Sequence, residues 1–349
     1  MINLYDLSKD NLQALLKSWG EPSYRAQQLY NWLYEHRVNN FDAMTNLPAS
    51  LRERLAQDAV LGTLETVAEQ SSNDGTTKRL YRLPDGQLIE SVLMPYDDHR
   101  RTACISSQAG CAMGCVFCAT GQMGFARNLS ATEIFEQAMR FARELEAEGE
   151  RLSNIVMMGM GEPFHNYDAV MEAIRRLMNE LQIGQRHITV STVGMVPQIR
   201  RFADEGLQVT LAISLHKADD NERSELMPVN KRWNLQELIG ACHYYVEKSG
   251  RRVTFEWAAI AAENDTPEEA HKLGKLLQGL HCHVNIIPLN PTGGYAGLPS
   301  DPERINAFIA ILGEYGISGT VRVRRGIDID AGCGQLKSKV ITPSNIQIT

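Results

Sequence analysis

From about residue 100 onward, short apolar runs alternate with longer segments whose apolar residues recur at helical spacing. The predicted strands cover residues 154–158, 187–191, 208–214, 253–260, 284–289 and 320–324. The predicted helices cover residues 168–181, 197–205, 235–247, a segment after 266–267, and 301–315. This alternation is typical of a parallel sheet covered by helices. We therefore expect an α/β fold built as a partial (β/α)6 barrel, with an open doubly wound sheet as the alternative. Both carry their chemistry at the carboxyl ends of the strands.

The first hundred residues follow a different pattern. Residues 24–36 and 48–56 have the periodicity of two short helices. Two apolar runs then flank Asp85-Gly86, a dipeptide that strongly favours a β-hairpin. We divide the chain into an N-terminal helical accessory domain at 1–75, a linking β-hairpin at 76–99 and a core at 100–349.

Composition excludes few classes of protein. The 349 residues carry a net charge of −7 and contain no apolar run of the roughly 20 residues that a membrane span needs. The N-terminal segment does not resemble a signal peptide, so we expect a cytoplasmic protein without a membrane partner. The negative charge argues against non-specific nucleic-acid binding. Short basic groups recur at 100–101, 231–232, 251–252 and 322–325, and only their convergence in space would form an RNA-binding surface.

Three of the seven cysteines, Cys111, Cys115 and Cys118, have the spacing C-x3-C-x2-C. Iron–sulfur clusters are held by cysteine thiolates, normally four of them. Three closely spaced ligands would leave one iron open to a small molecule. Zinc is the alternative, but it usually takes two paired sets of ligands, and the sequence has no second pair. We therefore predict one [4Fe-4S] cluster on these three cysteines.

A second group of candidate residues follows the predicted strands. Gly161 and Glu162 come after the 154–158 strand, where a glycine lets a ligand approach the backbone and a carboxylate can receive an ammonium group. The remaining candidates at strand ends are Ser191, Ser214, Leu215, His216 and Asn290. Each alone is equally consistent with a cap or a turn. Together, on successive strands, they outline one cofactor-binding mouth.

The cysteine spacing resembles that of the radical S-adenosylmethionine superfamily, and several longer segments make the resemblance closer. Segments 106–111, 158–163, 191–194, 214–216 and 328–336 together resemble the RlmN/Cfr family of adenosine methyltransferases. The resemblance runs nearly end to end and includes the N-terminal helical module, which it implies to be an RNA-binding domain. It implies a radical S-adenosylmethionine barrel, with 23S rRNA and tRNA as partners of a monomeric enzyme.

The resemblance also implies a reaction. In RlmN-type members a methyl group is added to carbon-2 of an adenosine in the peptidyl-transferase centre of 23S rRNA, and of an adenosine beside the tRNA anticodon. Two S-adenosylmethionine molecules are used per turnover. Cys333 takes a methyl group from the first, and the second yields the 5′-deoxyadenosyl radical that activates this methyl group. Cys104 then forms a disulfide with Cys333 and releases the product, while Glu90 is the implied base. A flavodoxin-like electron donor and a thiol reductant would be supplied from outside.

Alternatives remain open at this point. Pro163 favours an RlmN-type chain, whereas Ile327 looks more like a Cfr-type chain, which methylates carbon-8, and Gly332 replaces the family's usual alanine. A radical activase of another protein would give Cys104 and Cys333 no role. A non-enzymatic iron–sulfur RNA-binding module would bind a cluster without cleaving the cofactor.

Overall fold

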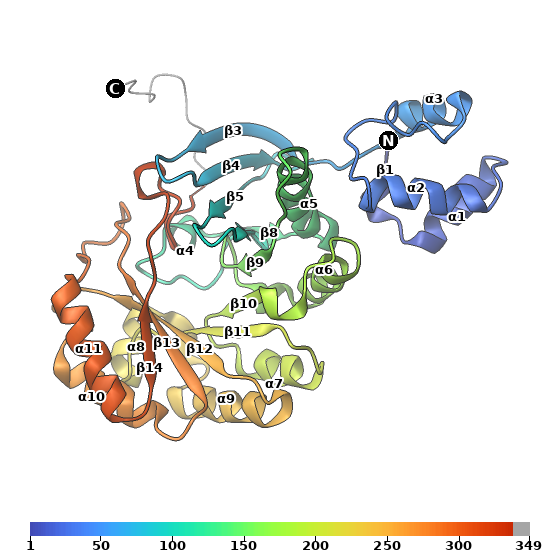
Figure 1. Cartoon of the computed structure of the whole chain (residues 1–349). Helices are drawn as coiled ribbons and strands as arrows, with labels where there is room; N and C mark the ends of the chain where they lie inside the picture. The colour runs from blue at the N-terminus through green and yellow to red at the C-terminus, as the bar shows by residue number, and fades with distance from the viewer. Residues whose placement is uncertain (338–349) are drawn as a thin grey trace.

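A computed structural model describes residues 1–337, and its centre is one ten-stranded sheet (Figure 1). The strand order is β14-β13-β12-β11-β10-β9-β6-β5-β4-β3. Seven neighbouring strands run parallel: β6 (Arg101–Cys104), β9 (Asn154–Met157), β10 (Ile188–Thr192), β11 (Thr210–Ser214), β12 (Val253–Ala259), β13 (Cys282–Pro288) and β14 (Ser318–Val321). Because β3 and β14 are free edges, the sheet curves without closing into a full barrel.

Each of the first six parallel strands is followed by a helix that returns along the outside of the sheet (Figure 1). These helices are α5 (Ala131–Ala147), α6 (Tyr167–Asn179), α7 (Val196–Asp204), α9 (Leu235–Ser249), α10 (Pro267–Leu277) and α11 (Pro302–Glu314). Capping boxes begin α5 and α9, because Ser130 and Asn234 accept from the third backbone N–H and a glutamate side chain accepts in return. The predicted partial (β/α)6 barrel is confirmed.

The linking hairpin is also present. Strands β4 (Thr77–Arg82) and β5 (Leu88–Pro95) pair antiparallel around Asp85-Gly86, with Gly86 at a φ of 86°. β5 pairs antiparallel with β6, so the hairpin extends the main sheet. A further strand, β3 (Glu65–Ser71), pairs with β4 and was not anticipated, although Asp74-Gly75 between them is the same kind of turn signal.

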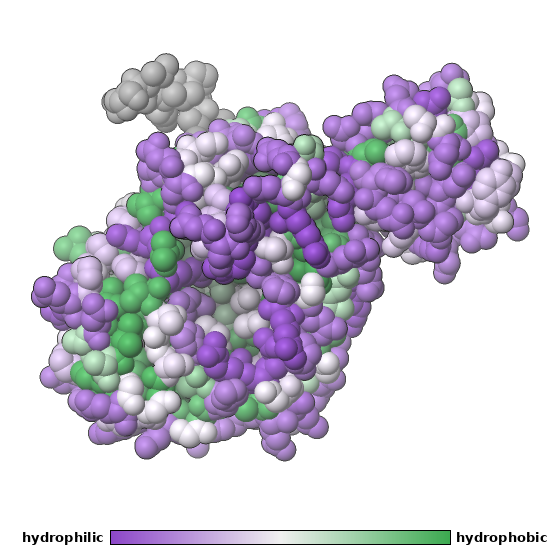
Figure 2. Space-filling view, viewed as in Figure 1, coloured by the Kyte–Doolittle hydropathy of each residue, from purple (hydrophilic) through white to green (hydrophobic). Residues whose placement is uncertain are grey.

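Three helices, α1 (Lys9–Ser18), α2 (Tyr24–Tyr34) and α3 (Ala49–Asp58), form a lobe beside the barrel, with a largely hydrophilic surface in this view (Figures 1 and 2). The lobe packs on α5. The Tyr5 ring meets Phe135 edge-on at 6.2 Å between centroids, and Arg143 donates to the Tyr5 hydroxyl at 2.6 Å. The division of the chain into three domains stays a prediction. No helix within residues 1–337 is both long and apolar enough to cross a membrane.

Candidate active site

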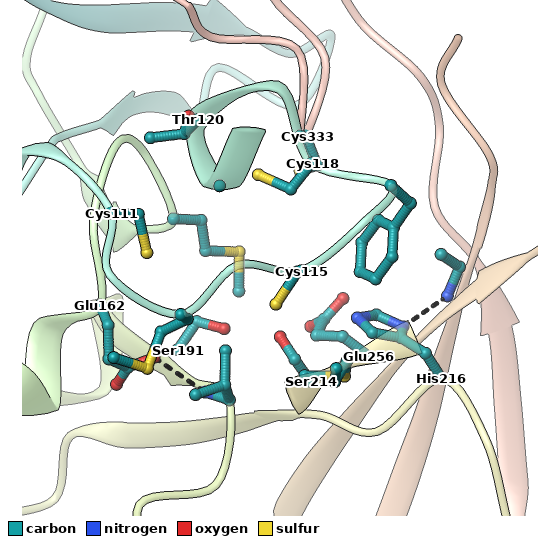
Figure 3. Close-up of a pocket in the computed structure, with 18 of the residues that line it drawn as sticks. Cys111, Cys115, Cys118, Thr120, Glu162, Ser191, Ser214, His216, Glu256 and Cys333 are labelled. Carbon is teal, nitrogen blue, oxygen red and sulfur yellow. Dashed lines mark hydrogen bonds between the residues drawn. The ribbon is translucent and has the colours of Figure 1, made fainter. Parts of the chain in front are cut away.

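A cavity opens at the carboxyl ends of the parallel strands and encloses about 1080 Å³ of space including its mouth. Its wall contains most of the residues that the sequence singled out: Cys111, Cys115, Cys118, Gly161, Glu162, Ser191, Ser214, His216, Asn290 and Cys333. Figure 3 shows the three cysteines on one loop, with Glu162 and the serines facing them from the strand ends. The fold therefore brings these separate motifs to one place.

Close backbone packing shapes the cysteine loop. A Cβ added at Gly121 would lie 2.9 Å from the Cys115 carbonyl oxygen, and one at Gly110 would lie 2.1 Å from the Gly124 oxygen. Only glycine fits such contacts. The loop ends at Cys118, which precedes the short helix α4 (Ala119–Met123). Three thiols within one constrained turn are thus held on the same wall of the cavity.

The environment of these thiols fits a cluster. Burial raises the pKa of Cys111 to about 12 and raises the pKa values of Cys115 and Cys118 as well, so a bound cation is needed to keep them as thiolates. Within residues 1–337, no three Cys, His, Asp or Glu side chains converge as ligands of one metal ion do. A cluster suits this arrangement better than zinc, because each thiolate would bind a different iron.

Glu162 is prepared to receive a positively charged group. It follows β9, and its carboxylate accepts from the backbone N–H groups of Phe164 at 3.0 Å and Val193 at 2.9 Å. Burial nevertheless raises the pKa of Glu162 to about 7. The chain approaches closely here, since a Cβ at Gly161 would lie 2.5 Å from Gln108 Cβ. A buried carboxylate that lines the cavity and is held by two amides is suited to an amino group such as that of methionine.

The ends of β10 to β13 complete this side of the cavity. His216 Nδ1 accepts from the Ala258 N–H at 2.9 Å, and burial lowers the pKa of His216 to about 3, so the ring is neutral. Asn290 Nδ2 donates to the Cys333 carbonyl at 3.0 Å. Its Oδ1 is buried without a hydrogen-bond partner among residues 1–337, and it is therefore an acceptor available to a bound molecule.

A smaller cavity adjoins the first and holds the other two cysteines of interest. Cys104, the last residue of β6, and Cys333 both line it, and Cys333 lines the large cavity as well. Burial raises the pKa of Cys104 to about 12, the nearby charge of Cys333 raises it further, and Arg322 opposes both. Cys104 and Cys333 are both free thiols.

Two charged side chains that line the large cavity were not predicted as site residues, although Arg322 belongs to the basic group at 322–325. Arg322 lies just after β14 and lines both cavities, and its guanidinium is 3.9 Å from the Glu256 carboxylate. The charge of Cys333 is the main cause that raises the pKa of Arg322. Glu256 lies on β12 and lines the large cavity. Glu256 could have been found from the sequence, because it is the charged residue within the mainly apolar strand predicted at 253–260.

Two predicted residues lie apart from both cavities. Leu215 is fully buried, and its side chain lines neither of them. Glu90 is buried on β5, where its carboxylate is 3.4 Å from Lys78 Nζ and accepts from the Lys337 N–H at 2.9 Å. Glu90 is therefore linked to the C-terminal segment that carries Cys333 without facing the cavity.

Comparisons with known proteins agree with this geometry. The family "Ribosomal RNA large subunit methyltransferase N-terminal domain" matches residues 2–61, and "Radical SAM superfamily" matches residues 105–274. The chain is 54% identical to "Dual-specificity RNA methyltransferase RlmN 1" of Myxococcus xanthus, over 97% of this chain and 95% of that protein. It is 47% identical to "Probable dual-specificity RNA methyltransferase RlmN" of Halalkalibacterium halodurans, over 97% and 93%.

A solved structure is similar as well. The crystal structure of a radical SAM methyltransferase from Sphaerobacter thermophilus superposes with a TM-score of 0.93 at 50% identity, covering 97% of this chain and all of that one. The barrel, its open cavity and the three-cysteine loop thus define a radical S-adenosylmethionine enzyme, a class that uses a [4Fe-4S] cluster and S-adenosylmethionine. The chain belongs to the RlmN family of radical S-adenosylmethionine RNA methyltransferases.

Proposed function

We propose that this enzyme methylates carbon-2 of an adenosine in the peptidyl-transferase centre of 23S rRNA and of an adenosine beside the tRNA anticodon. The observation that carries the proposal is the shared wall between the two cavities. Cys333 belongs to both, so one side chain reaches the cluster-side cavity and also the pocket of Cys104. A methyl carrier must contact the cofactor first and the resolving thiol later, and Cys333 has this position.

When bound, the cluster and S-adenosylmethionine supply the electron and the 5′-deoxyadenosyl radical. Cys111, Cys115 and Cys118 would hold the cluster, and Glu162 would receive the methionine amino group. Cys333 acts as the nucleophile: its sulfur forms a bond to the sulfonium methyl carbon, whose bond to the cofactor sulfur breaks with its electron pair. Asn290 restrains this loop through the Cys333 carbonyl.

Release of the product depends on the second thiol. After the methyl carbon has joined the adenine ring, the Cys104 thiolate attacks the Cys333 sulfur. An S–S bond forms, the bond between sulfur and the product carbon breaks, and its electron pair stays on that carbon. The carbon takes up a proton there, which replaces the hydrogen atom that the 5′-deoxyadenosyl radical would have removed from it before it joined the ring. Substitution at carbon-2 also requires loss of the carbon-2 proton, for which Glu90 is the proposed acceptor, and of one electron, which would return to the cluster. An external thiol reductant then restores both cysteines.

The finer features of the cycle are part of the same proposal. We propose one cluster and two S-adenosylmethionine molecules per turnover, with a flavodoxin-like electron donor. We also propose that residues 1–75 form an RNA-binding domain, and that the protein works as a cytoplasmic monomer. Ser191, Ser214, Leu215 and His216 are proposed to hold the cofactor, Leu215 only through its backbone because its side chain is buried away from the cavity.

The test uses protein with its cluster reconstituted anaerobically, and 23S rRNA and tRNA from a strain that lacks the enzyme. Mass spectrometry of the digested RNA is expected to show 2-methyladenosine with the wild-type protein and none with Cys333→Ala. Peptide mass spectrometry is expected to show S-methylcysteine at Cys333 in the wild type. 8-Methyladenosine would instead identify a Cfr-type enzyme, and RNA methylation by Cys333→Ala would refute the S-methylcysteine route.

Glu90 needs a separate test because it faces Lys78 and not the cavity. Glu90→Gln retains the size of the side chain and removes its basicity. We expect this variant to methylate Cys333 normally and to form product at least about a hundredfold more slowly. A wild-type rate of product formation would remove Glu90 from the mechanism.

A further inference from the structure

The rim of the smaller cavity has a surface that the reaction described above does not use. Besides Cys104 and Cys333, the lining of this cavity includes Val323, Arg324 and Arg325. These residues follow β14, one of the two edge strands of the sheet. The name "arginine rim" is used below for residues 323–325.

The charges of the arginine rim have few partners within the protein. Arg324 is exposed and has no ion pair or hydrogen bond to any part of residues 1–337. The Arg325 guanidinium lies 4.8 Å from the centre of the Tyr96 ring, and its Nε is buried without a hydrogen-bond partner among the same residues. Arg325 Nη1 donates only to the Asp74 carbonyl, at 3.3 Å. No carboxylate of the described chain neutralises either guanidinium.

Apolar side chains are exposed beside these charges. Val321 and Val323 are 43% and 67% exposed, which is unusual for branched apolar residues at a sheet edge. Figure 2 shows an apolar strip over β14, bordered by hydrophilic surface toward β3 and β4. Arg100 also lies over the Tyr96 ring, at 4.4 Å, and pairs with Asp98 at 2.7 Å, so the charge without an acidic partner beside this ring is that of Arg325.

Arginines without acidic partners, an aromatic ring and exposed apolar groups suit a single-stranded RNA segment. The guanidinium groups bind phosphates, and unstacked bases pack on apolar or planar side chains. The position suits the same ligand, because an adenine that reaches Cys333 from outside through this cavity must pass the rim. An acidic peptide would use the charges but would not need the route to Cys333.

We propose that the arginine rim binds the RNA strand next to the reacting adenosine, with Arg324 and Arg325 on flanking phosphates and Val323 against a neighbouring base. This inference rests on the proposed function and adds the place where the substrate strand crosses the protein. It assigns to this surface a role separate from that of the N-terminal helical lobe.

The experiment measures binding of a transcript of the peptidyl-transferase region of 23S rRNA to reconstituted protein over a series of salt concentrations. The variants are Arg324→Gln, Arg325→Gln and the double variant. Each single change is expected to raise Kd about tenfold, as the loss of a charged hydrogen bond does. Each is also expected to reduce the slope of log Kd against log salt by about 0.7, the value for one phosphate contact on a single strand.

Arg200→Gln is the matched control. Arg200 is also an exposed arginine over a tyrosine ring, Tyr244, at 5.2 Å, but it lies on α7 on the outside of the sheet. It is expected to leave Kd and slope unchanged. RNA-independent methylation of Cys333 is expected to stay at the wild-type rate in every variant, which shows that the protein and its cluster are intact. If Arg325→Gln loses this methylation, its half-buried side chain is needed for an intact protein. The RNA affinity of Arg324→Gln, which changes an exposed side chain, then tests the proposal.

Two outcomes distinguish a failure of the arginine-rim proposal from a failure of the proposed function. If wild-type protein methylates the transcript while the double variant binds it with unchanged Kd and slope, the arginine rim is refuted and the proposed function stands. If wild-type protein binds the transcript through the rim without methylating it, the proposed function fails and the binding surface stands.

Discussion

The two groups of cysteines in this protein are buried to a similar degree but lie in different electrostatic surroundings. Near Cys111 and Cys115 the neighbouring thiols and the Glu162 carboxylate add to the effect of burial, and all of these raise the thiol pKa values. The charge of Arg223 lowers the pKa of Cys115, but it is the smallest of the effects on that thiol. Near Cys104 and Cys333 the protein supplies Arg322, whose charge lowers the pKa of Cys104.

This difference shows how two adjoining cavities support two uses of sulfur. Ligand thiols are stabilised as thiolates by the iron that binds them, so the protein needs no cation of its own beside each of them. Thiols that must attack carbon or sulfur have no metal to help them, and a fixed arginine takes that role. The comparison predicts that changes on one side of the cavity leave the other side working.

The largest effect is expected from the cluster side. Cys115→Ala removes one of three ligands, so the protein should lose its bound iron and sulfide and release no 5′-deoxyadenosine, with complete loss of RNA methylation. Iron and sulfide analysis after anaerobic reconstitution measures this. The matched control is Cys282→Ala, a buried cysteine on β13 outside both cavities, which should retain the cluster. A full cluster in Cys115→Ala would contradict the ligand assignment.

Cys104→Ala should act only at the end of the cycle. The cluster and the methyl group on Cys333 remain, but no thiol can release the product, so a covalent protein–RNA species should accumulate to about one per protein. Denaturing gel electrophoresis with labelled RNA shows this species. Multiple turnovers without any crosslink would show that Cys104 is not the resolving thiol.

The substitution Arg322→Met tests directly whether a protein cation supports the cysteines that lack a metal. Removal of the guanidinium should raise the pKa of Cys104 further, so that release of the product from Cys333 slows about tenfold near pH 7.5. Raising the pH should restore part of the rate, and Arg322→Lys should retain most of it. Cluster content should not change. Equal rates for the methionine and lysine variants across the pH range would show that the charge is unimportant.

The smallest effect concerns stability on the cofactor side. His216 is buried and neutral, with a folded pKa of about 3 against 6.5 for a free imidazole. Its depressed pKa means that its contribution to stability is complete above pH 6.5 and is lost as the pH falls toward 3. At pH 5 the free energy of unfolding should have dropped by about 2 kcal/mol from this group.

Denaturant titrations at pH 7.5 and pH 5 test this, with His216→Gln as the reference. The variant lacks the titrating ring, so its stability should fall less than that of the wild type over this interval. The other ionisable groups are the same in the wild type and the variant, so their titration affects both proteins equally. An equal loss of unfolding free energy in the wild type and in His216→Gln would show that His216 is not the responsible group.

Local motifs explain what could be predicted. The order of strands and helices, the turn at Asp85-Gly86 and the three-cysteine loop each depend on residues a few positions apart. Strands β3 and β6 were not predicted because neither has an apolar run: β3 is largely polar, and β6 begins with Arg101 and Thr102. Helix α1 lies in the segment expected to be helical but was given no bounds, although Ser8 caps it and its ten residues equal the length of α3.

The sequence alone predicted the three-cysteine loop as the cluster site and picked out the polar residues at the strand ends, because each of these motifs is made of residues a few positions apart. Only the tertiary structure decided that Cys104 and Cys333 share a cavity, that Arg322 lies between the two sites, and that Glu90 faces Lys78. These contacts join residues that are distant in the chain. Strand register and loop packing set them, and a one-dimensional pattern of apolar and polar residues does not encode either.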